Sequence, residues 1–385
     1  MYEEIIYFVA FWVGIVTVYN LIGEKYQKYL DVGLFILIIR TTKINKLINK
    51  LAFKFSSFWK SLTTLEIVTG FLLTIFVIYF LLQNLIYFFV APPAAAPIQP
   101  LIPGITISLS TLWYLIIPLV LVVVPHEFFH GLMARVGGIR LKSAGIVLFL
   151  IIPGAFVEVD EKELPFSKLK ARLAVYAGGS FINIITGILA LLMILNFVLV
   201  ISPLYHPAPG ILITDVVPGS PADGTLHKWD VLYSINGTTF ATLDDFYSYM
   251  DNVLSGQTLI LNTSRGVFTI TAASHPQNAT KGFIGIAPFP YFAPNPWIPW
   301  AQPAIPYILF VTLNWTWLLG FNLAIFNMLP FPPLDGDKFI GDTLKSLIKN
   351  KQIARYTFLI VRLFSSALLF GNLLLTFLNG GFIVL

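Results

Sequence analysis

The 385-residue sequence contains no cysteine, and only 11% of its residues are charged. Without cysteine the chain has no disulfide, thiol nucleophile or thiolate metal ligand, so any transition metal must be bound by histidine and carboxylate side chains. Soluble proteins carry about 25% charged residues. Because 57% of this chain is apolar, it cannot cover itself with polar surface in water, and we expect an integral membrane protein.

Six apolar runs are long enough to cross a bilayer, since about 20 helical residues span a hydrocarbon core of about 30 Å. We therefore predict a polytopic α-helical membrane protein with six transmembrane helices. The first run follows two glutamates rather than a basic segment, so we expect a retained span and not a cleaved signal peptide. The expected spans are residues 5–22, 67–90, 107–133, 173–201, 305–329 and 358–378.

Two other apolar stretches are too short or too interrupted to span. Residues 30–40 run into a basic amphipathic stretch that ends near Lys60, and we expect this region at the membrane interface. Residues 144–159 are interrupted by Pro153 and Gly154 and are rich in β-branched and aromatic side chains. They predict a β-hairpin or a re-entrant segment.

The basic residues orient the spans. Of the 24 Lys and Arg residues, eight lie between the first and second spans, seven follow the third and six follow the fifth. The positive-inside rule places these loops in the cytoplasm, so both termini and the long insert between spans four and five lie outside. Since this topology explains the net charge of +5, we expect no nucleic-acid partner. The predicted location is a prokaryotic plasma membrane.

The insert, residues 206–288, reads as a small extracytoplasmic domain of mainly β character. It has six Asp against three basic residues, two alternating runs at 258–261 and 267–271, and a turn signal at Asn236-Gly237. The sequences ITDVVPGSPA, WDVL and ING resemble PDZ domains attached to bacterial and archaeal proteases. Residues 209–212 are a candidate peptide-binding segment, and a generic β-rich spacer is the alternative.

The third span carries the strongest chemical motif, His126-Glu127-x-x-His130. Helical residues four apart share a face, so the two imidazoles can bind one metal while Glu127 takes a proton from water. An acidic residue at mid-membrane costs roughly 2.5 to 3.5 kcal/mol, so such residues are functional by default. The alternative is a histidine pair satisfied by neighbouring helices.

A catalytic zinc site needs a third protein ligand, and Asp335 is the candidate. It follows a Pro-rich stretch that stops the fifth span and favours extended backbone, which suits a cavity lined by protein or water. A plain Pro-rich turn with Asp335-Gly336 at its tip explains the local residues equally well.

Together, these two motifs resemble the site-2 protease family of intramembrane zinc metalloproteases. In that family the two histidines and the aspartate of Leu-Asp-Gly bind zinc, and the glutamate is the catalytic base. Residues 153–158 match the family's membrane-inserted β-hairpin. Residues 177–183 are similar to its Ala-Gly-Pro-x-x-x-Asn signature, although Gly179 stands where proline is common. The resemblance covers about residues 111–336, and the single PDZ-like insert suggests an archaeal member.

The resemblance implies one Zn²⁺ per chain, bound by His126, His130 and Asp335, with Glu127 as base. It implies regulated intramembrane proteolysis of single-span membrane proteins in the lipid bilayer, with a peptide or a new C-terminus bound at the PDZ-like domain. Asn183 and Asn327 are candidates for contacting substrate backbone, or equally for helix packing. The site is expected toward the cytoplasmic side.

Two other functions are compatible with the sequence: a metal transporter that uses the same three ligands, and an inactive membrane scaffold with a PDZ-like domain. A transporter needs no general base, and a scaffold is expected to lack a ligand or the base. We divide the chain into an N-terminal membrane region with a basic cytoplasmic loop, a catalytic membrane core, the PDZ-like domain and a C-terminal membrane region. These cover residues 1–106, 107–205, 206–288 and 289–385.

Overall fold

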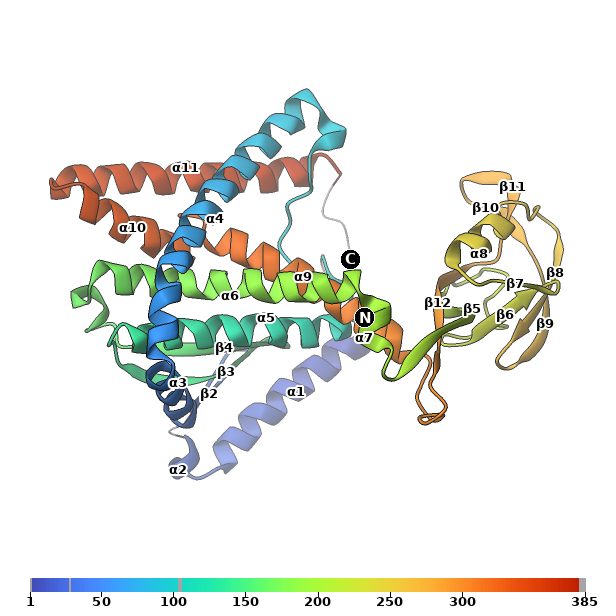
Figure 1. Ribbon diagram of the computed structural model, residues 1–385, viewed down its shortest axis with the longest axis horizontal. Coiled ribbons are helices and arrows are strands. Elements are labelled where there is room, and N and C mark those ends of the chain that lie inside the picture. Colours follow the sequence, from blue (N-terminus) through green and yellow to red (C-terminus); the bar gives the residue numbers. More distant parts are fainter. Residues whose placement is uncertain (1, 28, 103–105, 381–385) are drawn as a thin grey trace. The chain divides into compact units, whose positions relative to one another are not determined.

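The computed structural model describes residues 2–27, 29–102 and 106–380 (Figure 1). The chain forms two compact units. One contains Met1–Ala190 together with Trp315–Leu385, and the other contains Leu191–Asn314.

Five helices are long and apolar enough to cross a membrane, and they correspond to the second through sixth expected spans. The helix α1 (Tyr2–Leu21) has an apolar part, Ile6–Leu21, that is shorter than these spans. The first expected span therefore stays a prediction. The five helices are α4 (Ser56–Val90), α5 (Leu109–Val136), α6 (Leu169–Leu195), α9 (Ile305–Asn327) and α11 (Lys351–Leu378).

A four-stranded antiparallel sheet accompanies these helices, in the order β1-β2-β3-β4. The strands β3 and β4 fall in the segment for which a hairpin is expected, whereas β1 and β2 occupy residues 30–40, where no strand is predicted. Their turn lacks an Asn-Gly or Asp-Gly signal, and Phe35 supplies the positive φ of 55°. The bounds are β1 (Leu30–Gly33), β2 (Ile36–Thr41), β3 (Leu141–Phe149) and β4 (Ile152–Val159).

Short helices complete this unit. The helix α3 is amphipathic, as expected for the basic stretch before Lys60, and it packs Ile48 and Ala52 into a core shared with α5 and α6. Close packing of α4 depends on Gly70, because a Cβ there would lie 3.0 Å from the Cβ of Ala177 on α6. The short helices are α2 (Glu24–Gln27), α3 (Lys43–Lys54), η1 (Pro92–Ala94), η2 (Leu164–Phe166) and α10 (Asp335–Leu347).

The second unit is mainly β and contains a sheet in the order β12-β5-β6-β8-β9, with β7 paired to β6. The two alternating runs form β8 and β9, as predicted. The turn at Asn236-Gly237 is also confirmed, since both residues have positive φ, 48° and 81°. The elements are α7 (Phe197–Ile201), β5 (Tyr205–Val216), β6 (Val231–Ile235), β7 (Thr238–Thr239), α8 (Leu243–Met250), β8 (Thr258–Thr263), β9 (Gly266–Thr271), β10 (Ala273–His275), β11 (Asn278–Phe283) and β12 (Ile286–Pro294).

The strand β12 extends beyond residue 288, the expected end of this domain, because its last residues pair with the start of β5 as far as Pro294 with Tyr205. Residues 209–212 lie inside β5, and Ile211 pairs with both Pro290 and Leu232. Both edges of this segment are therefore occupied, so the prediction that it binds peptide is wrong.

Candidate metal centre

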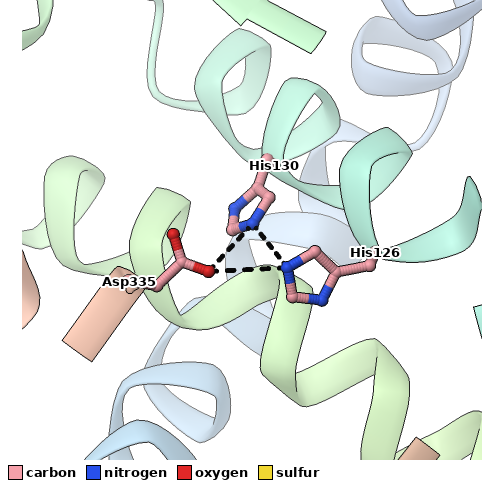
Figure 2. A group of neighbouring side chains, drawn as sticks. All are labelled: His126, His130 and Asp335. Atoms are coloured by element: carbon pink, nitrogen blue, oxygen red, sulfur yellow. Dashed lines mark hydrogen bonds and ion pairs between the residues drawn. The ribbon is translucent and has the colours of Figure 1, made fainter. Parts of the chain in front are cut away.

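Three side chains converge at one point between α5 and α10 (Figure 2). His126 and His130 lie on one face of α5, and Asp335 is the first residue of α10. The turn that leads into α10 packs against the end of α9, since a Cβ on Gly336 would lie 2.2 Å from the carbonyl oxygen of Met328. The tight turn explains why glycine follows the aspartate.

The ligand atoms form a nearly equilateral triangle. His126 Nε2 lies 3.0 Å from His130 Nε2, and Asp335 Oδ2 lies 3.4 Å and 3.2 Å from these two nitrogens. A tetrahedral zinc ion with bonds of about 2.0 to 2.1 Å requires ligand atoms about 3.3 Å apart. The triangle therefore fits zinc, with the fourth corner of the tetrahedron left for water or substrate.

The surroundings orient one histidine and keep the aspartate ionised. The Nδ1–H of His130 donates to the carbonyl oxygen of Val175 at 2.6 Å, which leaves Nε2 with its lone pair toward the centre. Burial acts to raise the pKa of the Asp335 carboxyl, but the adjacent His130 and His126 outweigh it and hold that pKa below its usual value. An ionised carboxylate is what a metal site requires.

Asn183 of α6 lies behind His126 rather than on the cavity surface. Its side chain is fully buried, with the amide nitrogen 3.0 Å from His126 Nδ1. Its Oδ1 has no hydrogen-bond partner among the described residues. If the oxygen and nitrogen of the Asn183 side-chain amide exchange places, Oδ1 accepts a hydrogen bond from the Nδ1–H of His126. His126 Nε2 then keeps its lone pair for a metal, as a ligand must.

A cavity of about 450 Å³ opens onto the three ligands. Glu127 and Asn327 both line it. The backbone N–H of Val157 on β4 donates to Glu127 Oε2 at 3.4 Å, and the Asn327 amide nitrogen lies 3.2 Å from His126 Nε2. The base, a polar donor and a sheet edge therefore meet at one cavity. Of the six residues expected at the site, only Asn183 is absent from its lining.

The sequence analysis assigned no role at the metal centre to two residues, Gly179 and Val175. A Cβ on Gly179 would lie 2.5 Å from His130 Nε2 and 2.6 Å from His126 Nε2, so α6 approaches the ligands as closely as glycine allows. Val175 contributes only its backbone carbonyl. No side-chain pattern signals a backbone contact, whereas the missing family proline at residue 179 was a visible signal.

Comparison with known proteins agrees with this geometry. A sequence profile described as Peptidase family M50 matches residues 114–371, more than half of the chain. The chain belongs to peptidase family M50. The resemblance to site-2 proteases is thereby confirmed, and zinc is the metal of the M50 peptidases.

Two relatives of this M50 chain cover parts of it. A protein of Methanocaldococcus jannaschii, described as uncharacterized, is 30% identical over 239 residues, which are 62% of this chain and 58% of the relative. A membrane-bound transcription factor site-2 protease homolog of Arabidopsis thaliana is 28% identical over 135 residues, 35% of this chain and 26% of the relative. The chain thus spans less than two thirds of either relative.

Among solved structures, the PDZ domains of SdrC-like proteins from Listeria innocua and Listeria monocytogenes are each 24% identical to this chain, with TM-scores of 0.19. They match 20% of this chain and 92% and 86% of their own lengths.

Proposed function

We propose that this M50 chain is an intramembrane zinc metalloprotease that hydrolyses peptide bonds within or near transmembrane segments of membrane proteins. The observation that carries this proposal is the triangle of His126, His130 and Asp335 with Glu127 beside it, in a unit built from membrane-length helices. A transport site needs no general base next to its ligands, and an inactive scaffold has no reason to keep all four residues.

Each residue of the proposed site has its own role in the reaction. His126, His130 and Asp335 would hold a zinc ion, which would supply the Lewis acidity that activates a water molecule at neutral pH. Glu127 takes the proton from that water on its carboxylate and delivers it to the leaving amine nitrogen. The amide of Asn327 lies where it can donate to the oxygen of the scissile carbonyl as negative charge develops. Asn183 positions His126.

The deciding experiment compares the wild-type protein with Glu127→Gln in cleavage of a labelled single-span substrate in liposomes. We expect cleavage to fall by about 100-fold or more, the usual contribution of a general base, with zinc content unchanged. Glu158→Gln is the matched control, because it removes a carboxylate that lines the same cavity. If Glu127→Gln cleaves like wild type, or if neither protein cleaves while both move zinc across the membrane, the protease proposal is wrong.

Substrate binding is proposed at the outer edge of β4. This strand is the last of its sheet, and the N–H of Val157 points to Glu127 rather than to β3. Since backbone groups alternate sides along a strand, Ala155 and Pro153 face the same free edge. Proline there costs no bond to β3. An unwound substrate segment can add to this edge as a further strand.

For topology we propose six spans, with α1 as the first, the β3–β4 hairpin inserted in the membrane and the metal centre toward the cytoplasm. The distribution of basic residues supports this orientation and places both termini and the PDZ-like domain outside the plasma membrane. We propose the same four regions with the end of the third moved from residue 288 to the end of β12, that is 1–106, 107–205, 206–294 and 295–385.

In the mainly β unit we propose a PDZ-like peptide site at β12 instead of residues 209–212. The strand β12 has one strand neighbour, β5, among the described residues, so its other edge is open to a peptide strand. A cavity of about 530 Å³ lies between α8 and residues 282–286, lined by Phe246, Met250 and Phe283 among others. It would bind an extended peptide or a new C-terminus with an apolar side chain.

A further inference from the structure

A second cavity, of about 810 Å³, lies where three membrane helices have their ends. The lining includes Lys60 and Thr63 from the first two turns of α4, Val136 at the end of α5, and Lys170 from the first turn of α6. Because these helices have the length and composition of membrane spans, the cavity sits at the boundary between hydrocarbon and water.

The lining carries an excess of positive charge, supplied by four exposed lysines: Lys60, Lys162, Lys168 and Lys170. Glu163 is the one acidic residue in the lining that the structure describes, and its carboxylate already accepts hydrogen bonds from the backbone and guanidinium of Arg140. Within the described residues, no carboxylate forms an ion pair with any of the four lysines. Lys170 Nζ donates to Thr64 Oγ1 at 3.0 Å, and the positive charges of all four lysines are left without a carboxylate partner there and can attract an anion.

Beneath these lysines the cavity is apolar. Met133, Ile139 and Ala174 line it and are 1%, 2% and 1% exposed. Phe166, in contrast, is 91% exposed, and an exposed phenyl ring can be buried at the boundary between lipid headgroups and acyl chains. A cavity with exposed lysines and a buried apolar lining is better suited to an amphiphile than to a fully hydrated ion.

We propose that this cavity binds the phosphate-bearing headgroup of an anionic membrane phospholipid. Basic cavities at the cytoplasmic ends of membrane helices have the charge and depth for such headgroups. Lysines bind phosphate as mobile point charges, so the four need no fixed geometry in the free protein. The occupant is part of the bilayer, which supplies it at high local concentration.

One segment of the chain lines both this basic cavity and the cavity of the metal ligands. In the segment between β4 and α6, Lys162 and Phe166 line the basic cavity, whereas Glu161 and Leu164 line the cavity of the metal ligands. A headgroup bound to Lys162 and Lys168 therefore restrains the segment that borders the substrate cavity. Any effect of this restraint on proteolysis rests on the proposed function, but lipid binding itself does not.

The test uses the full chain in a neutral detergent, with short-chain phosphatidylglycerol as the anionic probe and phosphatidylcholine of equal chain length as the neutral one. The cavity variant is Lys60→Gln/Lys162→Gln/Lys168→Gln. The control variant, Lys46→Gln/Lys349→Gln/Lys351→Gln, removes the same charge at exposed lysines outside the cavity. Lipid retention is measured by native mass spectrometry, and hydrogen exchange is followed in residues 160–168.

We expect phosphatidylglycerol to bind wild type and the control variant and to slow exchange in residues 160–168. The cavity variant should lose affinity by roughly 100-fold, because each lysine near an anionic lipid contributes about fivefold. Equal affinity of both variants for phosphatidylglycerol overturns the proposal. So does equal binding of phosphatidylcholine, or saturation by inorganic phosphate alone at the same concentration, which assigns the cavity to a soluble anion. None of these readouts depends on protease activity.

Discussion

At the scale of single residues, the metal centre depends on a position that carries no functional group. Gly179 faces both imidazoles, and α6 packs so closely that any side-chain carbon at this position would enter the space that the ligand atoms surround. Because residue 179 has no Cβ, the backbone of α6 can lie this close to the two imidazoles in this chain.

Replacing this glycine should separate folding from metal binding. We expect Gly179→Ala to keep its helix content, since alanine is a better helix former by about 1 kcal/mol, but to lose most of its zinc. Gly178→Ala is the control, because a Cβ there would lie 3.2 Å from the flexible side chain of Met133 and at ordinary contact distances, 3.4 and 3.7 Å, from Phe129. Zinc per chain is measured on both purified proteins. Equal zinc in the two would show that the imidazoles tolerate the methyl group.

A buried carboxyl in α4 allows a prediction about stability. Glu66 is 0% exposed, and neither of its carboxylate oxygens has a hydrogen-bond partner among the described residues. Glu66→Met should stabilise the protein by about 1 to 3 kcal/mol, the cost of an unsatisfied buried polar group. The thermal midpoint in detergent is the measurement.

Thr74, on the same helix, gives the comparison, because its buried hydroxyl does have hydrogen-bond partners. Thr74 Oγ1 lies 2.9 Å from the carbonyl oxygen of Gly70 and 3.0 Å from that of Met328. Thr74→Val should destabilise by about 1 kcal/mol. A lower midpoint for Glu66→Met than for wild type would contradict the prediction and show that the Glu66 carboxyl stabilises the fold.

At the scale of elements, the proposed binding of substrate at the outer edge of β4 can be tested by single substitutions. A single amide can be removed from this edge without touching the rest of the sheet, because Ala155 N–H faces away from β3 whereas Phe156, paired with Gly145, faces toward it. Ala155→Pro should slow cleavage about five- to tenfold, the value of about one hydrogen bond, with zinc content unchanged.

The neighbouring substitution is the comparison. Phe156→Pro removes a bond within the β3–β4 ladder, so it should weaken the hairpin itself, as seen by faster hydrogen exchange in β3. Unchanged cleavage by Ala155→Pro, measured with the same single-span substrate, would rule out strand addition at this edge.

Some helices and strands can be predicted from the sequence and others cannot. Five of the expected spans and the pair β8 and β9 were predictable, because apolar length and strict alternation are local signals. The strands β1 and β2 were missed because residues 30–40 form one apolar run whose turn uses Phe35 at positive φ, a conformation that composition does not reveal. Pairing of β2 with β3 joins segments about a hundred residues apart, and such pairing leaves no mark on either segment.

The site shows the same division. His126, Glu127 and His130 follow from helical spacing, whereas the local residues around Asp335 fit a plain turn as well as a ligand. Only the folded chain, or the family resemblance, brings Asp335 to the histidines. The sequence left Asn183 open between substrate contact and helix packing, because its motif does not show how deeply it is buried. The role now proposed is support of His126.

At the scale of the whole molecule, the chain combines a unit of membrane-length helices with a mainly β unit, for which we propose a protease core and a PDZ-like domain. The relation between the two is testable. Joining residue 205 to residue 294 removes the domain, since Tyr205 and Pro294 are paired neighbours. If the domain excludes bulky or untrimmed substrates, the shortened protein should cleave an untrimmed single-span substrate that the full chain spares. Both proteins should cleave a trimmed one.

The comparison uses the same liposomes and equal zinc content in the two proteins. Equal rates on both substrates would make the domain a spacer. Slower cleavage of the trimmed substrate alone would instead show that the domain binds the new C-terminus and delivers it.

The pairing of Tyr205 with Pro294 has a further consequence for folding. Paired residues in antiparallel strands have Cα atoms about 4.5 to 5.5 Å apart, so the chain leaves and returns at almost the same point. The remainder of the protein therefore closes this long insertion at the entropic cost of a short loop once the domain has folded. Insertion and loss of such a unit are thermodynamically mild events, and the membrane core can keep its own folding route while the domain is exchanged for another.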